Sequence, residues 1–268
     1  MGGIAIRIHK FGGSCLRDQR GFQRLTEIIS NEDKPVIVTV SAIYGVTQNL
    51  IDVLDTQVDQ LNIPSIISQL RELHLNLVNT TNKILPGLDK ELRKLERLLY
   101  GIAYTEEITP RTHDLILSFG ERLAVQIVNN YFVEMNVKSR IVGPENLICT
   151  NGIYKTSTIL LEETEKKCKE YEQNNALDEE ILVVPGYFGA SQDNIINLLG
   201  RSGTDYTATA LAYGFNTENI IIWKDVLGFM TADPNIIKQA KTLDSLSYEE
   251  AAELSHFGAQ ILHSRSVI

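Results

Sequence analysis

Short apolar runs, separated by stretches with helical spacing, constrain the fold of this chain more than any other feature. They read IAIRIH, KPVIVTVSA, VKSRIVG, ILVVPG, NIINLLG and ENIIIWKD, and several are nearly continuous rather than alternating. Such runs are typical of strands that are buried on both faces, as in parallel sheets covered by helices. The sequence therefore predicts an α/β protein, with a mainly parallel central sheet and helices layered against it.

A long stretch rich in leucine lies between the second and third of these runs. From Ile63 to Tyr104, leucine and isoleucine recur at steps of three and four residues, and Pro86 and Gly87 interrupt the pattern. This spacing predicts two amphipathic helices that are separated at Pro86 and Gly87. Their apolar positions are expected to lie in the core.

Composition excludes several classes of function. The chain has 268 residues, 43% of them hydrophobic, which suits one large globular domain that can have lobes. A net charge of −9 and the lack of a basic cluster disfavour binding to nucleic acid. Cys15, Cys149 and Cys168 are far apart and lack metal-ligand spacing, which predicts reduced thiols in a cytoplasmic protein without a metal centre. The apolar runs are too short to span a membrane.

The end of the first apolar run combines a lysine with two glycines. Lys10 is followed by Gly12, Gly13 and Ser14. Because glycine has no Cβ, backbone N–H groups there can approach an anion closely, and the lysine adds a positive charge. The stretch is not a Walker loop, in which the lysine follows the glycines. Two interpretations stay open, a tight turn with a surface lysine or a phosphate site.

Polar residues also stand at the end of the second run and at the start of a later apolar helix. Ser41 follows the run and Thr47 stands where a helix begins, so roles in a turn and an N-cap explain both without a ligand. Glu121 and Arg122 open the apolar helix of SFGERLAVQIV. Glu121 either favours the helix dipole or binds a substrate ammonium group.

The stretch GRSGTDYTATALA is the most specific of these places. An apolar strand ends at Gly200, and Arg201, Gly203, Thr204 and Asp205 lead directly into a helix rich in alanine. Helix capping accounts for Thr204 and Asp205. However, glycine, arginine and aspartate together at a helix N-terminus form an anion site with a carboxylate beside it. Because folding does not require that combination, we favour a functional interpretation.

Two stretches near the end of the chain add polar groups. Lys224 and Asp225 follow the strand of ENIIIWKD, and a helix then opens with Ser247, Glu249 and Glu250. Helix capping alone explains the two glutamates.

The order of these motifs resembles that of the aspartokinase family, within the amino acid kinase superfamily. The similar stretches are KFGGSCL, VTVSAIYGVTQNL, SFGERLA, GRSGTDYTATALA, WKDVLGFMTADP and SYEEAAELSHFGAQILHSRSV, which span nearly the entire chain. The resemblance implies a three-layer αβα sandwich over residues 1–268, with a lobe for ATP and a lobe for aspartate. It also implies transfer of a phosphoryl group from ATP to L-aspartate, giving ADP and 4-phospho-L-aspartate, with Lys10 and Asp205 as the catalytic residues. The pathway served would be amino-acid biosynthesis, for example of lysine or threonine.

The resemblance also implies the residues that bind the two substrates. Glu121 would take the α-ammonium group of aspartate and Arg201 its α-carboxylate, while Thr47 and Thr204 would complete the pocket. Mg²⁺ would be carried on the phosphates of ATP rather than in a protein cage. The residues expected on the nucleotide side are Gly12, Gly13, Ser41, Lys224, Asp225, Met230, Asp233, Asn235 and Gln260.

The chain departs from the family pattern on the nucleotide side. The family commonly has Thr or Ser in place of Lys224, Tyr in place of Met230 and Arg in place of Asn235, and it often has Lys in place of Gln260. The absence of an arginine at position 235 and of a lysine at position 260 weakens phosphate binding unless Lys224 compensates. Aspartokinases usually continue into two small regulatory ACT domains, which are not expected within this chain. A homodimer is expected, as is common in the family.

Other functions remain as alternatives. A kinase for glutamate or acetylglutamate has the same chemistry, although an N-acetylated substrate has no ammonium group to pair with Glu121. A catalytically weak module that binds an amino acid is favoured by Met230 and Asn235 and opposed by Lys10 and Asp205. A dinucleotide-binding oxidoreductase is disfavoured, because no G-x-G-x-x-G follows the first strand.

Overall fold

A parallel sheet forms the centre of the molecule. The computed structural model describes residues 6–56, 61–78, 84–175, 177, 180–217, 219–225, 228–232 and 236–256. The sheet has five strands in the order β3-β4-β2-β1-β7, and every neighbouring pair is parallel. These strands are β1 (Arg7–Phe11), β2 (Val36–Val40), β3 (Ser139–Ile141), β4 (Ile181–Pro185) and β7 (Ile220–Trp223).

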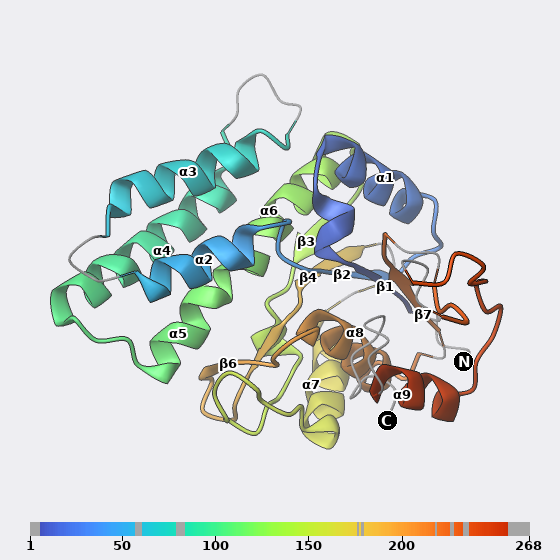
Figure 1. The fold of residues 1–268 in the computed structure, drawn as a ribbon. Helices are drawn as coiled ribbons and strands as arrows, with labels where there is room; N and C mark the ends of the chain where they lie inside the picture. The colour runs from blue at the N-terminus through green and yellow to red at the C-terminus, as the bar shows by residue number, and fades with distance from the viewer. Residues whose placement is uncertain are drawn as a thin grey trace.

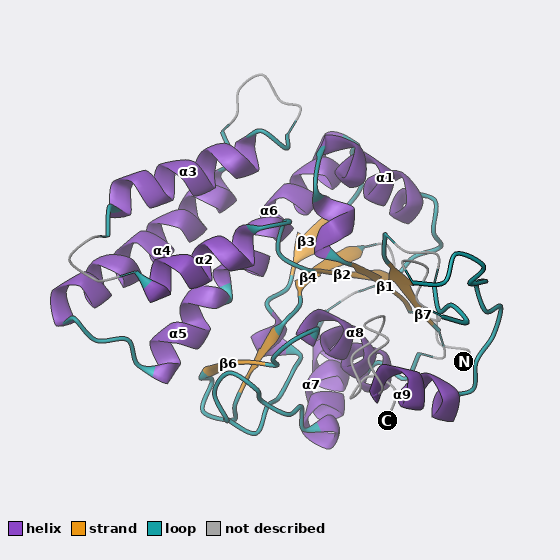
Figure 2. Cartoon of the chain, viewed as in Figure 1, coloured by secondary structure: helices purple, strands orange, loops and turns teal. Residues whose placement is uncertain are grey.

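Helices cover both faces of this sheet (Figure 1). On one face α6 (Phe119–Glu134) packs against β2, β3 and β4, and α1 (Gln19–Ser30) packs against α6. On the other face α8 (Gly203–Gly214) packs against β1, β2 and β7, and α7 (Leu161–Asn174) packs against α8. The predicted three-layer αβα sandwich is confirmed, and Figure 2 shows the sheet between its two helical layers.

The apolar runs supply a core on each side of the sheet because strand residues alternate between its faces. In β2, Val36, Val38 and Val40 belong to the core beneath α1 and α6, whereas Ile37 belongs to the core beneath α8. All five residues of β2 are buried. The continuous apolar sequence of this strand therefore reflects burial on both faces, as predicted.

A group of helices extends from one side of the sandwich (Figure 1). It comprises α2 (Val46–Asp55), α3 (Ile63–Leu75), α4 (Pro86–Thr105) and α5 (Pro110–Leu117). Helix α4 begins at Pro86, so the predicted separation of two amphipathic helices at this point is confirmed. Among the described residues, no helix is both long and apolar enough to cross a membrane.

The apolar run NIINLLG does not join the central sheet. It contains β6 (Ile196–Leu198), which pairs antiparallel with β5 (Phe188–Ala190) in a separate sheet of two strands. The backbone N–H of Ser191 donates to the carbonyl of Ile195, which closes the turn between them. Local hairpin closure thus determines the pairing of this strand.

The described secondary structure is completed by short helical turns and one further helix. The turn η1 spans Gly13–Leu16, and η3 spans Pro144–Asn146. Helix α9 (Tyr248–His256) lies near α8 in Figure 1. The backbone N–H of Glu250 donates to the Ser247 hydroxyl at 3.1 Å, and the Ser247 N–H donates to the Glu250 carboxylate at 2.8 Å. The predicted capping role is therefore confirmed for Glu250.

Candidate active site

Because the five central strands are parallel, their C-terminal ends lie along one edge of the sheet. The residues that follow these ends include Gly12 after β1, Ser41 after β2, Gly186 after β4 and Lys224 after β7. In open α/β sheets, ligands bind at this edge. Several of the residues predicted to be functional, including Lys10, Ser41 and Asp205, gather there from separate parts of the sequence.

A buried aspartate at this edge holds two lysines. The Nζ of Lys10 lies 2.6 Å from Oδ1 of Asp205, and the Nζ of Lys224 lies 3.0 Å from Oδ2 of the same residue. The side chain of Asp205 is only 2% exposed, compared with 6% for Lys10. Burial lowers the pKa of Lys10, and the carboxylate of Asp205 opposes this change. The predicted catalytic pair is thus in direct contact, with Lys224 as a third member.

Helix α8 brings Asp205 to the edge in its first turn. Its N-cap is Ser202, whose φ of 57° is left-handed, and no side chain caps the helix. Thr204 and Asp205 therefore do not cap α8, contrary to one of the two interpretations of the sequence. Capping therefore does not explain why a carboxylate stands at position 205. The contacts of Asp205 with the two lysines do explain it.

The glycine loop after β1 lies against both the lysine and the end of β2. A Cβ on Gly12 would lie 3.4 Å from Nζ of Lys10, and a Cβ on Gly13 would lie 2.8 Å from the carbonyl oxygen of Ala42. The backbone N–H of Ser41 donates to the carbonyl of Phe11 at 3.1 Å. Only glycine at position 13 allows so close an approach of the loop to β2.

Asp225 has separate partners on the same loop. Its Oδ1 accepts a hydrogen bond from the hydroxyl of Ser14 at 2.8 Å, and its Oδ2 lies 3.4 Å from a guanidinium nitrogen of Arg17. That guanidinium also lies over the ring of Tyr44, 4.4 Å from its centroid. Ser14 belongs to the lysine and glycine stretch that the sequence indicated, whereas Arg17 and Tyr44 were not predicted to be functional. The available signal for Arg17 was a positive charge on the fourth residue after Gly13.

Glu121 is a buried carboxylate near the end of β2. Its Oε1 accepts a hydrogen bond from the N–H of Ala42 at 3.1 Å, and its Oε2 has no hydrogen-bond partner among the described residues. Burial raises the pKa of Glu121 to about 8, although the bond from Ala42 acts in the opposite direction. A buried carboxylate with an unsatisfied oxygen is a natural site for a substrate cation.

Thr47 lies close to the start of helix α6. Gly120 immediately precedes Glu121 in the sequence, and a Cβ on Gly120 would lie 3.6 Å from the hydroxyl oxygen of Thr47. Helix α2 begins at Val46, and its N-cap is Gly45 with a φ of 85°. Thr47 therefore lies inside the helix, and the predicted N-cap role for it is wrong. Glycine takes that role because the chain needs a left-handed residue there.

Thr204 and Arg201 stand on the opposite side of the edge, around the start of α8. Thr204 is buried and packs so closely on Gly186 that a Cβ on this glycine would lie 2.3 Å from the methyl carbon of Thr204. Arg201 is exposed in the turn before α8. Gly186 was missed as a site residue, although the glycine directly after the strand of ILVVPG was its sequence signal.

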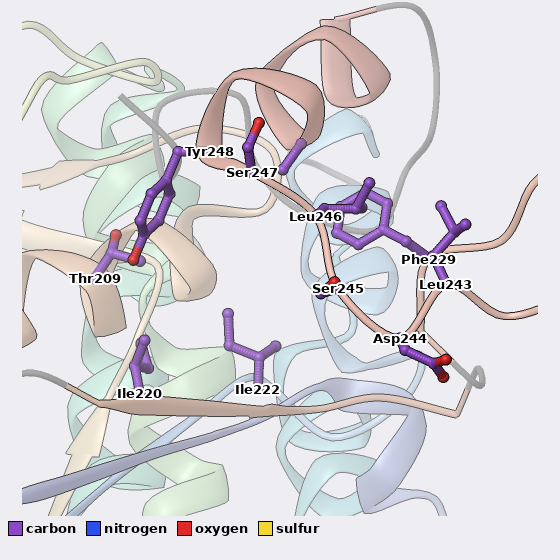
Figure 3. Close-up of a pocket in the computed structure, with 11 residues that line it drawn as sticks. Thr209, Ile220, Ile222, Phe229, Leu243, Asp244, Ser245, Leu246, Ser247 and Tyr248 are labelled. Atoms are coloured by element: carbon purple, nitrogen blue, oxygen red, sulfur yellow. The ribbon is translucent and has the colours of Figure 1, made fainter.

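The structure describes only some of the residues that were predicted on the nucleotide side. Met230 forms a bridge to Thr242 beyond β7. Near it is a pocket of about 320 Å³ between β7, α8 and the segment before α9 (Figure 3). Ile220 and Ile222 line it from the strand, and Leu246 and Tyr248 line it from the opposite side. Asp233, Asn235 and Gln260 lie outside the described residues.

Comparisons with known proteins agree on one family. The model of the amino acid kinase family matches residues 5–268. Aspartokinase 1 (chloroplastic) of Arabidopsis thaliana is 32% identical over 97% of this chain, which corresponds to 47% of that protein. Aspartokinase of Saccharomyces cerevisiae is 25% identical over 96% of this chain and 53% of its own length. The chain thus spans about half the length of these relatives.

A solved structure shares the fold. It is the crystal structure of E. coli aspartokinase III in complex with aspartate and ADP, with a TM-score of 0.87 and 24% identity. The match covers 98% of this chain and 59% of that one. The similarity extends over both faces of the sheet and the additional helices.

Proposed function

Because this chain belongs to the amino acid kinase family, we propose that it is an aspartate kinase that transfers the γ-phosphoryl group of ATP to the side chain of L-aspartate. The products are ADP and 4-phospho-L-aspartate. The observation that carries the proposal is that one sheet edge has two lysines on a buried aspartate and, near the end of β2, the buried carboxylate of Glu121. The first group suits a phosphoryl group and the second suits an amino acid. The similarity to named aspartokinases supports the same choice.

The chemistry requires no general base. The acceptor carboxylate is already an anion, and one of its oxygens forms a bond to the γ-phosphorus while the bond from phosphorus to the bridging oxygen breaks. The electron pair of that bond leaves with ADP. Catalysis therefore consists of positioning and of neutralising negative charge. Lys10 neutralises part of that charge and Asp205 orients Lys10. The backbone of Gly12 and Gly13 lies against the phosphates.

The amino acid is held by its two α-substituents. Glu121 binds the α-ammonium group. This group supplies a partner for the buried Oε2 of Glu121, which has no hydrogen-bond partner among the described residues. Arg201 offers a planar fork of donors to the α-carboxylate. Thr47, close to Gly120, and Thr204, at the start of α8, complete the pocket. An N-acetylated amino acid lacks the ammonium group, so this arrangement selects free aspartate.

The nucleotide lies along β7 in this proposal. The pocket of Figure 3 offers apolar walls for the base, and Ser41, Lys224 and Asp225 lie at the strand ends where the phosphates pass. Met230, Asp233, Asn235 and Gln260 remain predictions on this side. Mg²⁺ prefers oxygen ligands and keeps several waters. Among the described residues, no group of three Asp, Glu, His or Cys side chains could hold a metal ion, and in this proposal the ATP phosphates and water supply most of the ligands.

We propose the cytoplasm as the site of action, a homodimer as the assembly and amino-acid biosynthesis as the pathway. The three cysteines are free thiols in the structure, and two of them are buried. Free thiols suit a reducing compartment. The remaining assignments follow the similarity to the aspartokinases.

Substrate discrimination tests the proposed function. ADP release would be measured with L-aspartate and with N-acetyl-L-aspartate, for the wild type and for Arg201→Ala. We expect release only with free aspartate, and an apparent aspartate KM in the variant raised by roughly 10- to 100-fold, since a charged hydrogen bond is lost. The KM for ATP should remain unchanged. Arg93→Ala, at an exposed position of α4, is the matched control.

Equal activity with both acids would contradict the role of Glu121. An equal rise of the KM values for aspartate and for ATP in Arg201→Ala would indicate that this arginine contacts the nucleotide. Binding of aspartate without ADP release would indicate a module that binds an amino acid.

A further inference from the structure

Resting on the proposed function, we propose further that Lys224 is a second catalytic lysine. Its ammonium group would neutralise charge on the transferring phosphoryl group together with that of Lys10. Asp205 would hold the two ammonium groups at a fixed separation. This role differs from the general contact with the nucleotide that the sequence predicts for position 224.

The contacts of Asp205 provide the first argument. Each carboxylate oxygen faces a different lysine, at 2.6 Å for Lys10 and at 3.0 Å for Lys224. A single carboxylate compensates a single ammonium group, so these three side chains together carry one net positive charge. At a partly buried position such a charge attracts an anion more strongly than it would in water. A phosphoryl group at this edge matches that charge.

The strands provide the second argument, because they aim both lysines at the same aspartate. β1 and β7 are parallel neighbours, with Phe11 in register with Trp223. The indole of Trp223 stacks on Phe11 with centroids 5.8 Å apart, and its Nε1 donates to Nδ1 of His9 at 3.1 Å. Residues 9, 11 and 223 thus share one face of the sheet. Lys10 and Lys224 alternate with them and reach Asp205 on the other face.

Exposure provides the third argument. The side chain of Lys224 is 18% exposed, whereas that of Lys10 is 6% exposed. Lys224 therefore lies on the more open side of Asp205, where an incoming nucleotide has access. The neighbouring carboxylate of Asp225 contacts Ser14 and Arg17 through its two oxygens. Asp205 is a carboxylate that contacts Lys224 directly and can orient it.

In the reaction, no proton moves through Lys224. As the new oxygen–phosphorus bond forms and the bond to the bridging oxygen of ADP breaks, negative charge is spread over the phosphoryl oxygens. A lysine ammonium is a compact point charge that can follow these oxygens. Two such groups on either side of Asp205 would contact the phosphoryl group in the transition state.

Variants of Lys224 test this role. Lys224→Ala removes the charge, Lys224→Gln removes it while keeping most of the length, and Lys224→Arg keeps the charge. Lys166→Ala is the control, because this lysine is 63% exposed on α7 and pairs with Glu163. The readouts are kcat, the KM for ATP, and the Kd values of Mg-ADP and of a non-hydrolysable Mg-ATP analogue. Thermal unfolding reports whether each variant is folded. If Lys224→Ala is unfolded, the test relies on Lys224→Gln.

We expect kcat to fall by roughly 100- to 1000-fold in the two neutral variants, the range for loss of one charge-stabilising group. Lys224→Arg should recover about tenfold of this loss, a partial rescue because its planar group is a different shape. Affinity for Mg-ADP should change by less than about threefold, because the contact is made with the transferred group. Lys166→Ala should behave as the wild type.

Two results would overturn the role of Lys224. One is a kcat within threefold of the wild type in both neutral variants, and the other is an effect confined to the KM for ATP. If the wild type phosphorylates none of aspartate, glutamate and acetylglutamate, the proposed function fails separately. The Kd values then decide: loss of the preference for the ATP analogue over ADP in Lys224→Gln supports the contact, and an unchanged preference contradicts it.

Discussion

Glu121 and Lys10 are charged residues whose burial favours their neutral forms. Burial raises the pKa of Glu121 to about 8 and lowers that of Lys10. Each group regains a favourable environment when an opposite charge arrives, the ammonium group of the amino acid in one case and the phosphates in the other. At the scale of single residues, the proposed function therefore has the site bind its ligands partly by relieving the cost of these buried charges.

The raised pKa of Glu121 predicts pH-dependent binding of aspartate. Only the ionised carboxylate pairs with the ammonium group, and below pH 8 its ionised fraction grows about tenfold per pH unit. The Kd of aspartate, measured by calorimetry from pH 6 to 8.5, should fall accordingly and level off near pH 8. Glu121→Gln should bind weakly at every pH in this range. A constant Kd in the wild type would contradict the assignment.

Stability provides an independent check on the same group. The folded pKa of Glu121 lies above its unfolded value of about 4.3, so the folded state binds the proton more tightly. The contribution of Glu121 to the free energy of unfolding therefore decreases as the pH rises between these values. Without ligand, Glu121→Gln should become progressively more stable relative to the wild type from pH 5 to pH 8. An unchanged difference would show that Glu121 is ionised throughout.

At the scale of elements, close backbone approach places the helices on the sheet edge. Gly186 follows β4, and a Cβ there would lie 2.3 Å from the methyl carbon and 2.9 Å from the Cα of Thr204. The start of α8, which includes Asp205, can approach the sheet only because position 186 has no side chain. The position of the Asp205 carboxylate thus depends on a residue without a side chain.

Replacing glycines by alanine tests this dependence. Gly186→Ala should lower the free energy of unfolding by about 1–3 kcal/mol, the usual cost of overpacking. It should also reduce kcat, because α8 is displaced. Gly101→Ala in the interior of α4 is the matched control, since no atom lies within 4 Å of its added Cβ. This change should raise the free energy of unfolding by about 1 kcal/mol through helix propensity. Denaturant unfolding in which Gly186→Ala matches Gly101→Ala would contradict the packing argument.

At the scale of the whole molecule, the sequence was sufficient for the order of layers. Apolar runs such as that of β2 are continuous because both faces are buried, and the helices of the 63–104 stretch show their spacing and their break at Pro86. From the residues alone, a functional interpretation was favoured only for the stretch that contains Asp205. Lys10 and Glu121 stayed open, because a tight turn and the helix dipole also explain them, and their roles were implied by the resemblance.

The parts that could not be predicted depend on tertiary contacts. The contact of Lys224 with Asp205 results from the register of β1 with β7 and the packing of α8, neither of which is a local property. The N-cap of α2 falls on Gly45 rather than Thr47 because the path of the chain requires a left-handed residue. Pairing of β6 with β5 rather than with the central sheet depends on a local turn.

The most direct measurement is to trap the acyl phosphate with hydroxylamine in the presence of Mg-ATP. It would be made for the wild type and for Lys10→Ala, with L-aspartate, L-glutamate and N-acetyl-L-glutamate as acceptors. We predict hydroxamate from L-aspartate alone, and a rate in Lys10→Ala that is lower by at least about 100-fold. Hydroxamate from another acid, or equal rates in the two proteins, would contradict an aspartate kinase that works through the lysines on Asp205.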